Sequence, residues 1–193
     1  MMNLETTRLI LRDFTADDWP AVLAYQSDPR YLRYYEWTGR TAAEVQAFVQ
    51  MFLDHQRQQP RTRFQLAVTL KPDGRLIGNC GIRLRHAGSH EAEIGYELAH
   101  DAWRQGYATE AATEIIRFGF ETLGVHRITA EVVADNAGSI RVLERLGMRR
   151  EGHFRDRERY KGRWWDVLAY AILEDEWRAG RKAAGDRREG SNP

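Results

Sequence analysis

The chain has 193 residues, of which 42% are hydrophobic and 30% charged, the balance of a folded globular protein rather than a disordered or membrane-embedded one. The 29 basic and 28 acidic residues give a formal net charge of +1, and leaving out residues 181–193 leaves 25 basic and 26 acidic residues. Nucleic-acid binders usually carry a basic excess on their folded part, so we expect no nucleic-acid partner. No apolar run approaches the roughly 20 residues of a membrane span, so we expect no membrane partner.

Cys80 is the only cysteine. A single cysteine excludes an intramolecular disulfide and a zinc cluster of thiolates, and we expect no metal site. The stretch Met1–Ile10 carries Glu5 and Arg8 and lacks the apolar region of a signal peptide. We therefore expect a cytoplasmic protein in which Cys80 is a small buried hydrophobic residue.

Strand and helix patterns alternate along the first part of the chain. Residues 8–12 read as a short strand, and Thr15 begins a helix that ends at residues 28–29. An aromatic loop occupies residues 31–39, and residues 41–44 form the capping box of a second helix.

The rest of the chain adds hairpins to this alternation. Strands are expected at 64–70, 76–84, 92–98, 127–133, 148–157 and 164–172, and helices at 107–123 and 136–146. The pattern predicts an α/β fold with a mixed sheet of about seven strands flanked by about four helices. We expect one domain over residues 1–178 and a flexible tail over residues 179–193.

The most informative segment is Trp103-Arg-Gln-Gly-Tyr-Ala-Thr-Glu110, which joins a predicted strand to a predicted helix. Gly106 lets the backbone approach a ligand closely, and the small Ala108 keeps the helix start uncrowded. Free N–H groups and the positive end of the helix dipole suit a pyrophosphate, to which Arg104 could add a charge-assisted contact. The alternative is a plain strand-to-helix turn that uses glycine for its shape. The segment has neither a Walker lysine nor the full Rossmann glycine triplet, which argues against ATP and NAD.

With its surroundings, this segment resembles the GCN5-related N-acetyltransferases (GNAT), whose pyrophosphate loop has the pattern Gln/Arg-x-x-Gly-x-Gly/Ala. Gly106 and Ala108 fit this pattern, whereas Trp103 departs from it at the first position. The whole segment is similar to the version in the RimJ/RimL branch of ribosomal-protein N-terminal acetyltransferases. Further blocks resemble that branch in family order, namely Thr7–Arg12, Leu76–Ile82, Glu93–Leu98, Asn136–Met148 and Gly162–Tyr170.

The resemblance implies a sheet that splays open between the fourth and fifth predicted strands, with acetyl-coenzyme A as the acetyl donor. Pantetheine would pair with backbone groups around Leu98, much as an added strand would. The pyrophosphate would lie on the turn made by Arg104, Gln105, Gly106, Tyr107, Ala108 and Thr109. Asn136 would reach the amide or thioester end of the cofactor and Ser139 its sulfur, although both residues also suit helix capping. We expect a monomer or a homodimer.

Acetyl transfer to an amine demands little of side chains, because the thioester is already activated and alignment supplies much of the acceleration. The amine attacks as the free base, and a peptide α-amine has a pKa of about 7.7–8.0, so a modest base or a water chain suffices. The candidate bases are Glu93, Glu158 and Glu97, in that order, and the Ser139 hydroxyl could assist the departing thiolate. Alternation places Glu93, Gly95 and Glu97 on one face of a strand. Salt bridges at a sheet edge, or a charged loop around Glu158, would explain the same residues without catalysis.

Aromatic residues are the candidates for the acceptor-binding wall, which the family commonly builds from the loop between its first two helices. The candidates are Tyr31, Tyr34, Tyr35, Trp37 and Trp164. Because side chains alternate along a strand, either Trp164 or its neighbour Trp165 should lie in the core.

We therefore expect an N-acetyltransferase that transfers acetyl from acetyl-coenzyme A to a primary amine by direct attack in a ternary complex. The acceptor is either a protein N-terminal α-amine or a small-molecule amine. The alternative is a non-catalytic acyl-coenzyme A-binding sensor or interaction module on the same fold.

Overall fold

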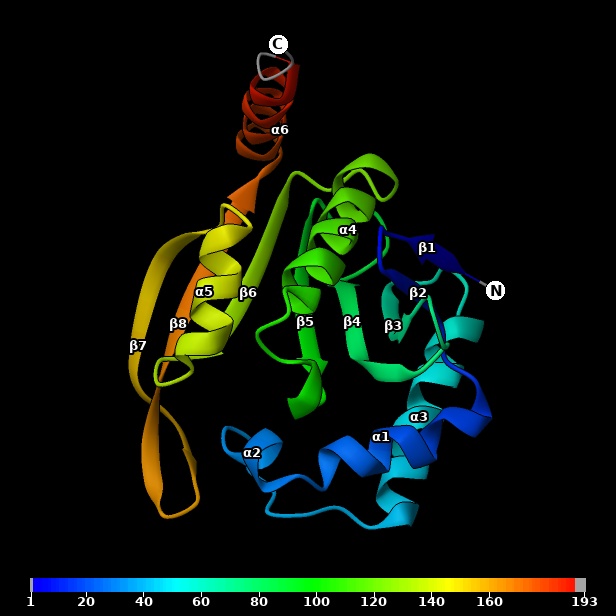
Figure 1. Cartoon of the computed structure of the whole chain (residues 1–193). Helices are drawn as coiled ribbons and strands as arrows, with labels where there is room; N and C mark the ends of the chain where they lie inside the picture. Colours follow the sequence, from blue (N-terminus) through cyan, green and yellow to red (C-terminus); the bar gives the residue numbers. More distant parts are fainter. Residues whose placement is uncertain (1, 190–193) are drawn as a thin grey trace.

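An eight-stranded mixed sheet runs through the computed structural model, which describes residues 2–189 (Figure 1). The strand order is β1-β2-β3-β4-β5-β6-β8-β7, and only β5 and β6 are parallel neighbours. The strands are β1 (Asn3–Glu5), β2 (Leu9–Asp13), β3 (Arg63–Leu70), β4 (Leu76–Leu84), β5 (Glu91–Leu98), β6 (Arg127–Val133), β7 (Arg149–Tyr160) and β8 (Arg163–Leu173). The α-helices are α1 (Trp19–Gln26), α2 (Pro29–Leu32), α3 (Ala42–Arg57), α4 (Tyr107–Glu121), α5 (Ala137–Arg145) and α6 (Glu174–Glu189).

The predicted mixed α/β sheet is confirmed, with one strand more than expected. That strand is the three-residue β1, which pairs with β2. Of the helices, α2 is a single turn at the start of the predicted aromatic loop, and α6 is helical to Glu189, where we expected a flexible tail from residue 179. Residues 190–193 lie outside the described part of the chain. In the part that is described, no helix combines the length and the apolar character that crossing a membrane requires.

Helices cover the two faces of the sheet at different places. Leu66 and Ala67 follow one another on β3, so their side chains point to opposite faces. Leu66 belongs to the larger core cluster, which includes Ile115 of α4, whereas Ala67 packs in a second cluster with Val22 of α1 and Val49 of α3. The helices α4 and α5 therefore cover one face, and α1 and α3 cover the other.

The parallel pairing of β5 with β6 is short. It joins only Glu91 to Arg127, Ala92 to Ile128 and Glu93 to Thr129. Beyond these pairs β5 continues to Leu98 and β6 to Val133, and the two strands diverge (Figure 1). The predicted splay between the fourth and fifth expected strands is thus confirmed, and it divides the sheet into a first arm, β1–β5, and a second arm, β6–β8.

Cys80 lies in the larger core cluster on β4 and is completely buried, as expected. Burial raises the pKa of its thiol to about 12. At pH 8 only about 10⁻⁴ of the thiol is then ionised, and the reactive species is the thiolate.

We therefore expect a disulfide-exchange thiol reagent to modify native protein at pH 8 only as fast as the fold opens. The same reagent should react within seconds in denaturing urea, which serves as the control. Stoichiometric modification of the native protein within seconds would contradict the burial of Cys80.

Candidate functional site

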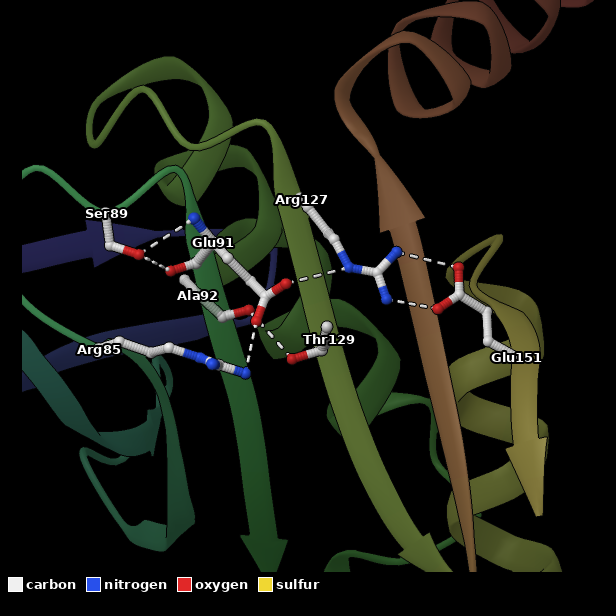
Figure 2. Close-up of polar contacts among 7 residues, drawn as sticks. All are labelled: Arg85, Ser89, Glu91, Ala92, Arg127, Thr129 and Glu151. Carbon is white, nitrogen blue, oxygen red and sulfur yellow. Dashed lines mark hydrogen bonds and ion pairs between the residues drawn. The ribbon is translucent and has the colours of Figure 1, made fainter.

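Ion pairs hold together the end of the splay where β5 and β6 are still paired, which we call the closed end (Figure 2). The Arg127 side chain on β6 donates to Glu91 Oε2 of β5 at 3.2 Å and to Glu151 Oε1 of β7 at 2.9 Å. Arg85 approaches the other oxygen of Glu91 at 2.9 Å, and the Thr129 hydroxyl donates to a backbone carbonyl of β5 at 3.3 Å. Three strands are therefore tied together where the pairing of β5 with β6 begins.

The divergence exposes a backbone edge of β5. The Ala99 N–H donates to the Ile77 carbonyl at 2.7 Å, so the backbone groups of Ala99 face β4. Because these groups alternate along a strand, those of Tyr96 and Leu98 face the gap. The Trp103 indole N–H donates to the Leu98 carbonyl at 2.8 Å, which gives a structural role to the residue that departs from the family pattern. The N–H of Leu98 and both groups of Tyr96 are left facing the gap, where an extended ligand could pair with them.

The turn before α4 has the geometry of an anion site. Arg104 and Gly106 both have positive φ values, 61° and 83°, and α4 begins directly afterwards. The Glu110 N–H donates to the Gly106 carbonyl at 3.0 Å. The three preceding helical N–H groups, those of residues 107–109, belong to the first turn, which has no intrahelical acceptors. These groups and the positive end of the helix dipole favour a phosphate.

Arg8 is a residue of this site that the sequence analysis did not single out. Its side chain donates to Glu110 at 2.7 Å and to the Gln105 carbonyl at 3.0 Å, and its guanidinium lies 4.5 Å from the centre of the Tyr107 ring. A Cβ added at Gly106 would lie 3.4 Å from the Arg8 guanidinium. Arg8 therefore places a guanidinium directly beside the turn, where Glu110 balances its charge.

Tyr96 and Ser139 connect β5 with α5 across the splay. Their hydroxyl oxygens lie 2.8 Å apart, and the Tyr96 hydroxyl also lies 3.1 Å from the Ser139 carbonyl. Burial raises the pKa of Tyr96, so this phenol stays protonated at neutral pH. Asn136 Oδ1 accepts from the Ser139 N–H at 3.1 Å, which confirms that Asn136 caps α5.

Glu97, a candidate base, is enclosed by hydrogen-bond donors. Its carboxylate accepts bonds from Tyr25, Gln26, Asn79, Tyr31 and Tyr35, of which the first three meet Oε1 at 2.7, 3.0 and 2.5 Å. Burial, followed by the charge of Glu97, raises the pKa of all three tyrosines, so they remain donors at neutral pH. Taking a proton from a substrate would require Glu97 to lose one of these bonds.

The other two candidate bases lie on different arms. Glu93 shares the face of β5 with Glu97, as alternation predicted, and is half-exposed at 3.0 Å from Arg83. Glu158 is exposed on β7 opposite Trp165, and its carboxylate has no ion pair or hydrogen bond among residues 2–181. Burial, with the charge of Glu158 next, raises the pKa of the neighbouring Tyr160 to about 12.

The predicted acceptor residues separate into three places. Tyr31, Tyr35 and Trp37 stack in sequence, with ring centres 4.7 and 4.8 Å apart, and meet the first arm at Glu97. Tyr34 points to the second arm, where its hydroxyl donates to the Asp135 carbonyl at 2.9 Å. Trp164 is 53% exposed and does not join either group, whereas Trp165 is 6% exposed, so the expectation that one of the pair is buried is confirmed.

A splayed sheet, with a phosphate-type turn beside its open edge, is the architecture of an acyltransferase that uses coenzyme A. Comparison with known proteins agrees, because the family model of the acetyltransferase (GNAT) domain matches residues 8–149. The uncharacterized N-acetyltransferase YnaD of Bacillus subtilis (strain 168) is 35% identical over 176 residues, which cover 91% of this chain and 99% of YnaD. This chain belongs to the GNAT acetyltransferase family, whose members use acetyl-coenzyme A.

Two further relatives extend the comparison. The crystal structure of a GNAT-family acetyltransferase from Bacillus anthracis aligns with a TM-score of 0.79 at 33% identity, over 90% of this chain and 99% of that one. The [ribosomal protein uS5]-alanine N-acetyltransferase of Escherichia coli (strain K12) is 33% identical over 92 residues, 48% of this chain and 47% of that protein.

Glu110 holds the start of α4 against the segment between β1 and β2, and its removal should destabilise the protein. Its carboxylate accepts from the Thr6 hydroxyl at 2.6 Å and the Arg8 N–H at 2.8 Å. Burial raises the pKa of Glu110, but these bonds and the Arg8 charge outweigh burial and leave the pKa below its usual 4.5. Since the folded pKa is lowered, the stabilisation is present above pH 4.5 and is lost as the pH falls through the folded value.

We expect Glu110→Ala to lower the free energy of unfolding by about 1–3 kcal/mol at pH 7, or the Tm by roughly 3–10 °C, because Thr6 and Arg8 lose a charged acceptor that is itself mostly buried. Calorimetric Tm values of mutant and wild type should converge as the pH falls below 4.5. Glu121→Ala removes the half-exposed partner of Arg117 on the same helix and is the matched control, for which the change should stay below about 1 kcal/mol. If the two variants lost the same free energy of unfolding at pH 7, Glu110 would have no special role in holding the start of α4.

Proposed function

We propose that this acetyltransferase moves the acetyl group of acetyl-coenzyme A to a primary amine by direct attack in a ternary complex. The observation that carries the proposal is the juxtaposition of a turn suited to a pyrophosphate with an unpaired edge of β5. A diphosphate followed by a chain with amide groups fits both parts at once. Neither ATP nor NAD has an extended chain with secondary amides that could pair with a strand edge.

The turn and the edge of β5 bind the two halves of the cofactor. The diphosphate accepts from the N–H groups of residues 107–109, and Arg8 and Arg104 supply positive charge. Pantetheine pairs with the backbone groups of Tyr96 and Leu98 that face the gap. Asn136 and Ser139 approach the thioester end from α5.

The reaction needs a nucleophile, a polarised carbonyl and a stabilised leaving group. The amine nitrogen forms a bond to the acetyl carbonyl carbon, a backbone N–H of β5 stabilises the oxyanion, and the C–S bond then breaks. Ser139, hydrogen-bonded to the protonated Tyr96, is placed to give a proton to the thiolate. The amine, attacking as the free base, loses one proton to a carboxylate or to water, and this proton replaces the one that Ser139 gives up.

Glu158 and Glu93 are the carboxylates available as base. Glu158 has no hydrogen-bond or ion-pair partner among the side chains described, and Glu93 has only Arg83. Glu97 already accepts five hydrogen bonds and is the least available of the three.

The acceptor is a protein N-terminal α-amine or a small-molecule amine. The Escherichia coli relative, by its name, acetylates an alanine of a ribosomal protein, which supports the first choice. The match to that relative covers only 48% of this chain, so the second choice, a small-molecule amine, is kept. A panel of small amines and peptides decides between the two acceptors, with the release of free thiol from acetyl-coenzyme A as the measured signal. Binding without turnover of any member would favour a non-catalytic sensor.

Gly106 tests the placement of the diphosphate. Acetyl-coenzyme A at 100 times its Kd should stabilise the wild type by about 2.7 kcal/mol, while ATP and NAD should have little effect. Gly106→Glu should abolish this thermal shift and the calorimetric binding signal, because the new carboxylate lies at the phosphate site and the φ of 83° disfavours any side chain. Gly88→Glu is the matched control, since Gly88 also has a positive φ, 77°, with open space around it. Unchanged affinity in folded Gly106→Glu would sink the assignment.

Separate substitutions test the base. We expect Glu158→Gln or Glu93→Gln to lower kcat by about 10²-fold at neutral pH with unchanged coenzyme A affinity, the low end of general-base effects. The loss should shrink towards pH 9, because the acceptor amine then deprotonates without help. If both variants keep the full rate between pH 6 and 9, catalysis needs no side-chain base and Ser139→Ala becomes the decisive variant.

A further inference from the structure

The segment Tyr31–Tyr35, called the strap below, has contacts with both arms of the sheet. Figure 1 shows α2, where the strap begins, at the open end of the splay, between the end of β5 and the β7–β8 hairpin. The Tyr31 and Tyr35 hydroxyls both donate to Glu97 Oε2 on the first arm. The aromatic residues of the strap therefore do not form a free wall, since two of them are held by one carboxylate.

The other side of the strap is attached to the second arm. The Tyr34 hydroxyl donates to the Asp135 carbonyl at 2.9 Å, and the Tyr160 hydroxyl donates to the Tyr34 carbonyl at 3.0 Å. Lys161 Nζ donates to the Leu32 carbonyl at 2.6 Å, and the Tyr34 ring packs edge-on against Trp165 at 6.1 Å. The strap thus crosses from one arm to the other at the open end, opposite the ion pairs that clamp the closed end.

The two attachments differ in strength. Glu97 is a charged acceptor in a partly buried place, where hydrogen bonds to a charge are about twice as strong as neutral ones. Tyr25, Gln26 and Asn79 hold the carboxylate itself in position, so the attachment to the first arm is rigid. The attachment to the second arm has one charge-assisted bond, from the exposed Lys161, and two bonds between neutral groups. With fewer bonds to a charge and more exposure, it is the easier one to release.

We propose that Glu97 is a positioning residue that anchors the strap across the open end of the splay, and that the strap decides which acceptor amines reach the thioester. This inference rests on the proposed function. A strap held to both arms fixes the distance between them at the open end, so we expect the size of the acceptor next to its amine to be the property that is selected. Glu97 acts through the tyrosines and does not exchange a proton with the substrate.

Two independent variants test the proposal in the full-length protein. Glu97→Gln weakens the anchor on the first arm, and Tyr34→Phe combined with Lys161→Met removes two attachments to the second arm while keeping the ring on Trp165. Glu5→Gln, which removes an exposed carboxylate paired with Lys71, is the control. The second variant changes half-buried and exposed side chains, so it keeps the proposal testable if Glu97→Gln does not fold.

Two measurements apply to each variant. Amide hydrogen exchange of residues 30–35 should become about 5-fold faster or more, while that of α4 stays unchanged, because one hydrogen bond contributes about 1 kcal/mol. The ratio of kcat/KM for an alanine-initiated hexapeptide to kcat/KM for glycinamide should change by about 5-fold in the same direction in both variants. The KM for acetyl-coenzyme A and the shape of the kcat–pH profile should match those of the wild type.

Distinct results would overturn the proposal. Unchanged exchange in residues 30–35 would show that Glu97 does not anchor the strap, and an unchanged acceptor ratio would show that the strap does not select acceptors. A loss of kcat in Glu97→Gln that disappears towards pH 9 would make Glu97 the base instead. If the wild type binds acetyl-coenzyme A but acetylates neither probe nor any panel member, the proposed function itself is wrong and the acceptor part falls with it. A failure of the proposed function is seen in the wild type, whereas a failure of the strap proposal is seen only in the variants, so the two are distinguishable.

Discussion

The limited parallel pairing between β5 and β6 is the constraint on which the rest of the structure depends. Only three residue pairs join the strands, and beyond Glu93 and Thr129 each strand has an edge without a strand partner. Backbone polar groups on such an edge need partners, because a buried N–H or C=O without one is costly. The Trp103 indole N–H is the hydrogen-bond partner of the Leu98 carbonyl, and the Tyr96–Ser139 contact spans the gap. The remaining groups on the edge of β5 are where a ligand gains most from binding.

A sheet divided in this way must be held at both ends. At the closed end Arg127 lies between Glu91 and Glu151, but it is partly exposed, and such ion pairs contribute little singly. At the open end the donors around Glu97 lie deeper, and Tyr25 and Tyr31 are each at most 5% exposed. None of these donors belongs to the second arm, which the strap meets through Tyr34 and Lys161. Salt should therefore weaken the exposed ion pairs of the closed end more than the partly buried bonds to Glu97, because screening acts most on exposed pairs.

Much of the fold follows from local patterns in the sequence. Thr41 and Glu44 form the predicted capping box, and Asn136 caps α5 as expected. Alternation indicated that either Trp164 or Trp165 is buried, but not which one, because that depends on the distant Tyr34, which packs on Trp165 together with Tyr160. The splay came from the resemblance to a family, since no periodicity reports how two strands diverge. The helix α6 was missed because the composition of its segment, rich in Gly and Arg, resembles that of a flexible tail.

The site was less accessible to prediction than the fold, for a physical reason. The turn before α4 is local, and its glycine and position were readable. Arg8, however, meets Gln105 across 97 residues, and Tyr25 meets Glu97 across 72. Contacts of this kind appear only when distant elements pack together, so Glu97 reads in the sequence as one more acidic residue on a strand.

The bond from Trp103 to Leu98 has one more consequence. It ties the turn before α4 to the end of β5, so the groups that face a phosphate and the groups that face an amide-bearing chain belong to one rigid unit. A molecule that engages one part finds the other already in register and loses little further conformational entropy. A phosphate fragment and an amide fragment added separately would each bind on their own. The molecule that joins them binds more tightly, because once one half is bound the other half is held at a high effective concentration. The two binding sites are therefore already positioned relative to each other before any ligand binds.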